Sequence, residues 1–128
     1  ETAQALNDGG SNSITDLDPQ WTAPAATTTT SGAVAISSGD DVLAFRVMSA
    51  SGTQSFRSTS WWGADDTKFT NARWAGLASS TNVSKIGNTN VTSGGSAALN
   101  TVQFYVDVAN TQTTGTYTGI ITFTVTAN

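Results

Sequence analysis

Residues 116–126 read TYTGIITFTVT, and this stretch decides the fold class of the chain. Every second residue from Tyr117 falls on one face of a strand, and that face carries Ile121, Phe123 and Val125. Threonine dominates the other face, and its β-branched side chain also favours strands. The alternation predicts a β-strand. Because this strand carries no charge and ends the chain, we expect it to lie in the sheet centre or to accept a partner strand.

A second alternating run precedes this strand. Valine or phenylalanine occupies the even positions of residues 102–108, while Gln103, Tyr105 and Asp107 occupy the odd ones. The polar stretch Asn110–Gly115 between the two runs has the composition of a turn. We therefore expect the two runs to form a hairpin.

A third strand is expected over residues 42–48, after a turn formed by residues 38–41. Its alternation places Phe45 and Val47 inward and Arg46 outward. Weaker strand candidates, separated by breaks that contain Gly or Asn, cover residues 33–37, 54–60, 71–77 and 82–86. Turn signals spaced roughly 8 to 12 residues apart are typical of β-sandwiches. The sequence thus predicts an all-β fold, a single β-sandwich of jelly-roll or immunoglobulin-like type over residues 14–128.

The N-terminal stretch, residues 1–13, differs from the rest of the chain. Its apolar residues are only Ala3, Ala5 and Leu6, and it ends in the polar, glycine-containing sequence of residues 8–12. Such a composition is typical of a flexible hinge. We expect an extended N-terminal arm attached to the β-sandwich domain.

Composition excludes most enzyme chemistry. The chain has 23 Thr and 15 Ser among 128 residues, and charged residues make up only 11%, against about a quarter in typical proteins. It contains no His and no Cys, so it lacks an imidazole base, a thiolate nucleophile and the usual zinc ligands. Its formal charge of −4 disfavours a phosphate backbone as partner. We expect a non-enzymatic protein that does not bind nucleic acid.

The sequence begins with Glu1 rather than Met, and no basic segment followed by an apolar run is present. We therefore expect a mature, exported chain whose signal peptide has been removed, located at the cell surface. No apolar stretch approaches the roughly 18 residues of a membrane-spanning helix. We expect no membrane span in the mature chain.

The acidic residues are the candidate acid, base or metal-ligating groups. Asp40 and Asp41 form one pair, and Asp65 and Asp66 form another. Both pairs sit in turn-like sequence, which favours a structural role. Loop carboxylates also suit Ca²⁺, which takes several oxygen ligands, so the four residues are weak candidates for a structural calcium site. A hydrolase acting through Asp65 and Asp66 is a third functional class to test.

Trp61 and Trp62 are adjacent, so in a strand their side chains would point in opposite directions. A core or interface position is favoured, because exposed tryptophan is unusual without a partner. The alternative is a platform on which a sugar stacks.

Asn82 and Asn90 each begin an Asn-X-Ser/Thr sequence, which is the acceptor pattern for N-linked glycosylation. The chain is rich in Asn, Ser and Thr, so chance produces such matches readily. The two sites are therefore candidates that agree with a cell-surface protein without requiring one.

A strand-rich chain must protect its sheet edges, and monomers often do so with Lys or Pro. This chain has two of each. Donor-strand complementation solves the same problem by completing the sheet of one subunit with an extended arm of another. We expect residues 1–13 to be the arm, with Ala3, Ala5 and Leu6 filling pockets in a neighbour. A head-to-tail contact of this kind generates a filament.

The segment from Gly115 to Thr126 resembles the final strand of many prokaryotic cell-surface β-sandwiches, including pilus and spore-coat-like subunits. In size and layout the chain is similar to archaeal and bacterial donor-strand fibre proteins, such as bundling pili and biofilm matrix fibres. It departs from chaperone–usher pilins in having no cysteine. The resemblance implies a structural subunit of an extracellular homopolymer. The alternative is a secreted carbohydrate-binding or adhesive β-sandwich module that binds surface glycans.

Overall fold

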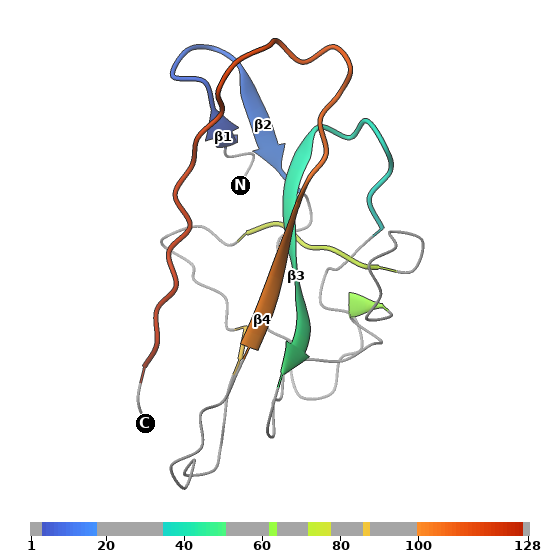
Figure 1. Ribbon diagram of the computed structural model, residues 1–128, viewed down its shortest axis with the longest axis vertical. Coiled ribbons are helices and arrows are strands. Elements are labelled where there is room, and N and C mark those ends of the chain that lie inside the picture. Colours follow the sequence, from blue (N-terminus) through green and yellow to red (C-terminus); the bar gives the residue numbers. More distant parts are fainter. Residues whose placement is uncertain are drawn as a thin grey trace, which may run out of the picture.

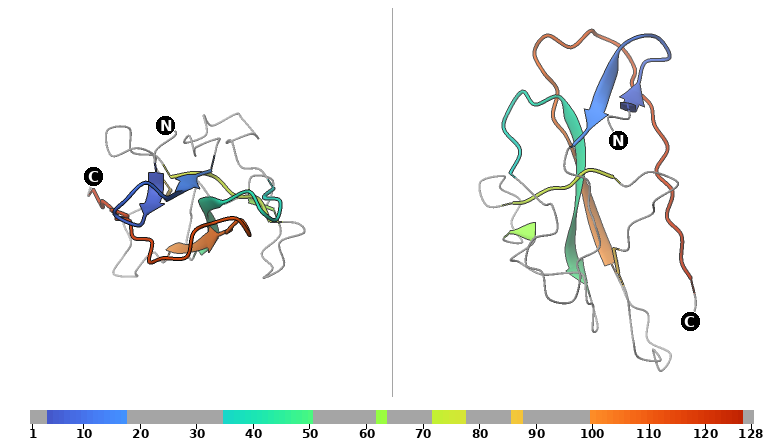
Figure 2. Two further views of the ribbon diagram at one scale, coloured as in Figure 1. Left: turned by 90° about the horizontal axis from the view of Figure 1, so that it is seen from above. Right: turned by 180° about the vertical axis from the view of Figure 1, so that it is seen from behind.

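The computed structural model describes residues 4–17, 35–50, 62–63, 72–77, 86–87 and 100–126. Its named elements are all strands: β1 (Gln4–Asn7), β2 (Ser13–Asp16), β3 (Val42–Ala50) and β4 (Asn100–Val106). They form one curled, mixed sheet in the order β1-β2-β3-β4 (Figures 1 and 2). Only Trp62 is helical among the described residues, and within them no helix is long and apolar enough to cross a bilayer. The described part is therefore strand-rich, as the sequence predicts.

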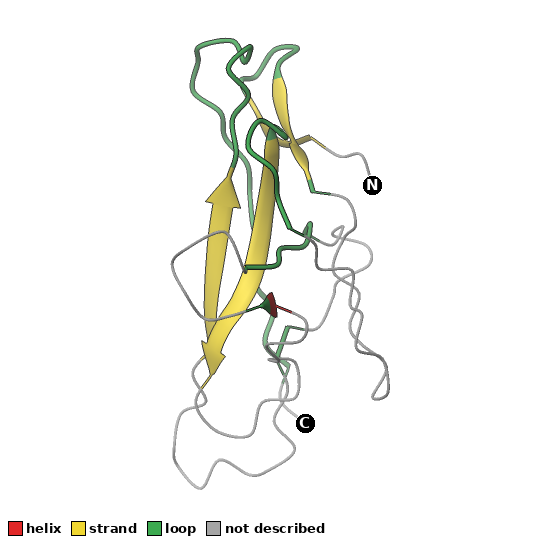
Figure 3. Cartoon of the chain, turned by 90° about the vertical axis from the view of Figure 1, so that its right-hand side faces the viewer, coloured by secondary structure: helices red, strands yellow, loops and turns green. Residues whose placement is uncertain are grey.

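β3 is the central strand because it has a neighbour along both edges. It runs antiparallel to β4, beside which it lies in Figure 3, and Phe45 is opposite Phe104. Its other edge pairs in parallel with β2 at residues 42 and 43. Farther along that edge, Phe45 and Ala75 exchange two backbone hydrogen bonds of 2.9 and 3.0 Å. A weak strand was expected over residues 71–77; the described residues 72–77 instead form isolated bridges, from Ala75 to Phe45 of β3 and from Ala72 to Gly63.

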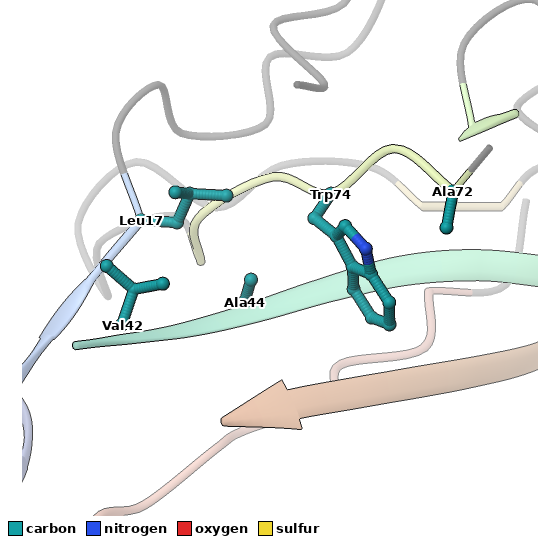
Figure 4. Packing of buried hydrophobic residues seen from close by; sticks show 5 residues of the cluster. All are labelled: Leu17, Val42, Ala44, Ala72 and Trp74. Atoms are coloured by element: carbon teal, nitrogen blue, oxygen red, sulfur yellow. The ribbon is translucent and has the colours of Figure 1, made fainter. Parts of the chain in front are cut away.

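Both faces of β3 are covered, and each holds one hydrophobic cluster. The cluster on the Phe45 face contains Phe45, Val47, Trp62 and Ala75, flanked by Leu77, Ile86 and Val102. The cluster on the opposite face contains Leu17, Val42, Ala44, Ala72 and Trp74, flanked by Ile36 and Tyr105 (Figure 4). Close packing between residues 72–77 and β2 requires a glycine, because a Cβ on Gly76 would collide with the carbonyl oxygen of Leu17. The core therefore surrounds β3.

Arg46 corrects one expectation from the sequence. It lies on the face of β3 opposite Phe45, as expected, but only 2% of the residue is exposed. Its Nε donates a 2.8 Å hydrogen bond to Oε1 of Gln103, and its guanidinium lies 5.0 Å from the centre of the Trp74 ring. The expectation of an outward Arg46 was wrong because a strand covered on both sides has no solvent face, and a buried cation needs such contacts.

The expected hairpin between residues 102–108 and 117–126 is not formed. β4 is present, but residues 117–126 do not pair with it. Instead Thr118 and Asn7 exchange two backbone hydrogen bonds of 3.0 and 2.9 Å, which join the chain to β1 at the opposite end of the sheet order. The connection after β4 is longer than a hairpin turn, and Gln112 Nε2 donates to the carbonyl of Ser13 at 3.3 Å on the way. The strand expected over residues 117–126 was therefore also wrong: residues 119–126 form no strand, because no described residue pairs with them.

Residues 4–16, most of which fall within the expected arm, form a hairpin of the sheet. β1 runs antiparallel to β2, with Leu6 opposite Ile14. The Asp8 carboxylate closes the connecting turn by accepting hydrogen bonds from Gly10 N at 2.8 Å and from Asn12 Nδ2 at 2.7 Å. β1 and β2 were not expected from the sequence, because each has only four residues.

Candidate functional site

The most exposed apolar part of the described structure is the C-terminal segment, defined as Gly119–Thr126. It runs along one side of the molecule, drawn in red in Figure 1. Among the described residues, none forms a backbone hydrogen bond with this segment. Ile120 and Val125 are each 95% exposed, and Phe123 is 58% exposed. The C-terminal segment has the strongest strand pattern in the sequence, yet it pairs with no described strand and its large apolar side chains are exposed.

The second feature is the outer edge of β4, defined by the backbone N–H and C=O groups of Phe104 and Val106. Val42 and Asp107 exchange backbone hydrogen bonds of 3.0 and 2.9 Å. Bonded and non-bonded pairs alternate along an antiparallel ladder, so the backbone groups of Phe104 and Val106 point away from β3. β4 is the last strand in the sheet order, and no described residue bonds to this edge.

The two faces of β4 and of the residues just after it differ in exposure. Phe104, Val106 and Val108 are 38%, 41% and 54% exposed, although Val102 on the same face packs against the Phe45 cluster. On the other face Asp107 is 7% exposed, and the centre of the Tyr105 ring lies 5.3 Å from that of the Trp74 ring. The reason is that the polar face of β4 covers the Trp74 side of the core.

The two features meet at one point. The rings of Phe104 and Phe123 have their centres 6.3 Å apart and lie at 66° to each other. Such edge-to-face contacts between aromatic rings are favourable. The Phe123 side chain therefore reaches the exposed face of β4, although no backbone hydrogen bond joins the C-terminal segment to β4.

Asp107 fixes the end of β4 to the turn before β3. Its Oδ2 accepts hydrogen bonds from Gly39 N at 2.6 Å and from Asp41 N at 3.3 Å. The Tyr105 hydroxyl donates to Oδ1 at 3.2 Å. Burial, and then this contact with the Asp107 carboxylate, raise the pKa of Tyr105 above its ordinary value. These contacts serve the fold, because they satisfy buried polar groups.

The carboxylates expected as calcium candidates are described only in part. Asp40 accepts a 2.8 Å hydrogen bond from Ser37 N, and Asp41 accepts one of 3.4 Å from Ala109 N. Accepting nearby backbone N–H groups is the usual structural use of turn carboxylates. In the described ranges, no three His, Cys, Asp or Glu side chains form a group that could hold a metal ion.

Trp62 belongs to the core. It is 2% exposed, and its ring centre lies 5.6 Å from that of Phe45. A side chain in this position cannot offer a face to a sugar. Within the expected arm, Ala5 and Leu6 are half-buried. The remaining candidate residues lie outside the described residues: Ala3, Trp61, Asp65, Asp66, Asn82 and Asn90.

The sequence pattern indicated two faces of β4 without showing which one is exposed, and it left the position of residues 117–126 open. The signal for the last strand was its lack of charge at the end of the chain. For β4 no signal exists in the local pattern, because alternation identifies two faces without saying which is covered.

Comparisons with protein-family models, with curated proteins and with solved structures found no match to this chain. Two surfaces of the molecule therefore bear on its function: the C-terminal segment and the outer edge of β4.

Proposed function

We propose that this chain is a structural subunit of an extracellular filament that polymerises head to tail by β-strand addition. One observation carries the proposal: the same molecule has an exposed, strand-patterned segment and a sheet edge to which no described residue bonds. These are different surfaces, so a contact between them leaves one of each available on the resulting pair. A heterologous contact that does not close into a ring continues as a filament.

The energetic reason for assembly is the apolar surface of the C-terminal segment. Covering a large aliphatic or aromatic side chain contributes about 1.5–3 kcal/mol, and the segment exposes Ile120, Ile121, Phe123 and Val125. Association costs roughly 4–15 kcal/mol in lost freedom of motion. The two quantities are comparable, so the backbone hydrogen bonds of an added strand are needed to favour the polymer.

Composition and fold agree with this role. Edge strands that avoid pairing usually carry charge or proline, whereas neither β4 nor the C-terminal segment contains a charged residue or a proline. We propose that the complete fold is a β-sandwich, in which a strand from a neighbour extends the sheet that β4 ends. The subunit acts outside the cell and catalyses no reaction.

The sugar-binding alternative loses one of its two tryptophans, because Trp62 is buried. It would have to depend on Trp61, which lies outside the described residues. The filament proposal uses surfaces that the structure describes, and we therefore prefer it.

The test is the size of the purified full chain as its concentration rises. We expect size-exclusion chromatography to show growing species and negative-stain microscopy to show filaments of uniform width. A folded monomer across the whole concentration range, with glycan binding that Trp61→Ala abolishes, would overturn the filament proposal in favour of the adhesive module. A folded monomer without glycan binding would overturn both.

A further inference from the structure

We propose that the C-terminal segment, rather than the N-terminal residues, is the strand donated, and that the outer edge of β4 in a second copy of the chain accepts it. This inference rests on the proposed filament function and specifies its joint. The N-terminal residues are already used within their own subunit, because β1 pairs with β2. Their donation would require that hairpin to open, whereas the C-terminal segment breaks no described sheet bond.

Donor and acceptor match in length. The C-terminal segment has eight residues, 119–126, and β4 has seven. Strands rise about 3.3 Å per residue, so the segment can cover β4 from end to end. It contains no proline, and every residue can therefore donate or accept in a ladder.

The side chains also match. If Phe123 lies opposite Phe104, the alternation places Ile121 and Val125 beside Val102 and Val106, in either strand direction. Each apolar residue of the acceptor face then meets an apolar residue of the donor. Aromatic and β-branched pairs of this kind stabilise neighbouring strands. The contact between Phe104 and Phe123 within one molecule shows that the two rings fit against each other.

The segment is held away from a hairpin with its own β4. Thr118 is bonded to Asn7 of β1, and β2 and β3 separate β1 from β4 in the sheet order. Gly119 packs closely on β1, because a Cβ there would collide with the Ala5 carbonyl oxygen and lie 2.9 Å from Cδ2 of Leu6. The start of the C-terminal segment is thereby held beside β1, at one end of the sheet order, while the outer edge of β4 lies at the other end.

The experiment uses two blocked variants of the full chain. The donor-blocked variant is Phe123→Asp, which places a charge in the segment. The acceptor-blocked variant is Val106→Lys, which places one on β4. Both residues are exposed in the single molecule, so both variants should keep the circular dichroism spectrum of the parent. The matched control is Thr114→Asp, an exposed position in the connection after β4, which should polymerise normally.

We expect each blocked variant alone to remain a monomer and an equal mixture of the two to form a one-to-one complex that grows no further. In that complex, the intact segment of the Val106→Lys chain occupies the intact β4 edge of the Phe123→Asp chain. Polymers in both variants would overturn this joint while leaving the filament function standing. If the parent chain itself never polymerises, the proposed function fails as well.

A second measurement does not depend on the charged variants folding. The chain has no cysteine, so Phe104→Cys and Phe123→Cys introduce single thiols. Mixed and oxidised, the two variants should give a disulfide-linked heterodimer in preference to either homodimer. A matched mixture of Phe104→Cys with Thr114→Cys should give no such preference. Equal heterodimer yields in the two mixtures would overturn the proposed joint.

Discussion

β3 and the C-terminal segment have similar sequences and opposite environments. Both alternate large apolar side chains with other residues, VLAFRVMSA in β3 and GIITFTVT in the segment. Residues 42–47 of β3 are all buried, whereas residues 119–126 are all exposed. The difference lies in the neighbours, because β3 has β2 and Ala75 on one edge and β4 on the other. A strand pattern therefore specifies the capacity to pair, and the partner decides burial.

The largest expected difference in stability is between substitutions of two phenylalanines, Phe45 in β3 and Phe123 in the C-terminal segment. Phe45 is 3% exposed, and Phe45→Ala should lower the free energy of unfolding by about 3–5 kcal/mol through lost burial and a residual cavity. Phe123→Ala removes the same atoms from an exposed site whose aromatic contact contributes about 0.5–1.5 kcal/mol. Urea unfolding at a concentration where the chain is monomeric measures both. Equal losses would show that the C-terminal segment is packed as firmly as β3.

Substitution of Asp107 is expected to have an intermediate effect on stability, because Asp107 joins the end of β4 to the turn before β3. Asp107→Asn leaves fewer acceptors for the amides of Gly39 and Asp41 and for the Tyr105 hydroxyl, at a cost of about 1–3 kcal/mol. Faster hydrogen exchange at Gly39 should accompany the loss. Asp40→Asn is the matched control, because Asp40 is exposed and accepts from Ser37 N. A control as destabilised as Asp107→Asn would contradict the assigned role.

The smallest effect on stability is expected from lowering the pH. Hydrogen bonds from the Asn12 side chain and the Gly10 backbone lower the pKa of Asp8 from its ordinary 3.8. Because the folded-state pKa is depressed, these bonds stabilise the β1–β2 turn above pH 3.8 and are lost as the pH falls through the lowered value. Amide shifts of Gly10 and Asn12 should follow that titration by NMR and become insensitive to it in Asp8→Asn.

The C-terminal segment contains no titratable side chain, so the amides of Ile120 and Val125 should not shift over the same pH range. The contrast would distinguish the β1–β2 turn, which polar contacts hold, from the C-terminal segment, which has no such contacts among the described residues. Shifts at both places would indicate a general loosening of the sheet rather than a local response of the turn.

The sequence predicted β3 and β4 well, because each has at least seven residues of clear alternation. It predicted a strand over residues 117–126 for the same reason, but residues 119–126 form none, because alternation does not supply a partner. It did not predict the β1–β2 hairpin, whose strands are too short for a pattern to emerge. It did not predict that Phe104 is exposed and Asp107 buried, because alternation distinguishes two faces without identifying the covered one.

The amino-acid sequence alone was enough to predict a strand-rich chain, to show that it has no histidine or cysteine, and to show that residues 116–126 are uncharged. These are local properties, which follow from side-chain shape and polarity at each position. Tertiary contacts are needed to explain why β3 is covered on both faces, why β4 exposes Phe104 and Val106 while Val102 packs on the core, and why Thr118 pairs with Asn7. These outcomes depend on contacts between residues far apart in the chain, and no local pattern encodes such contacts.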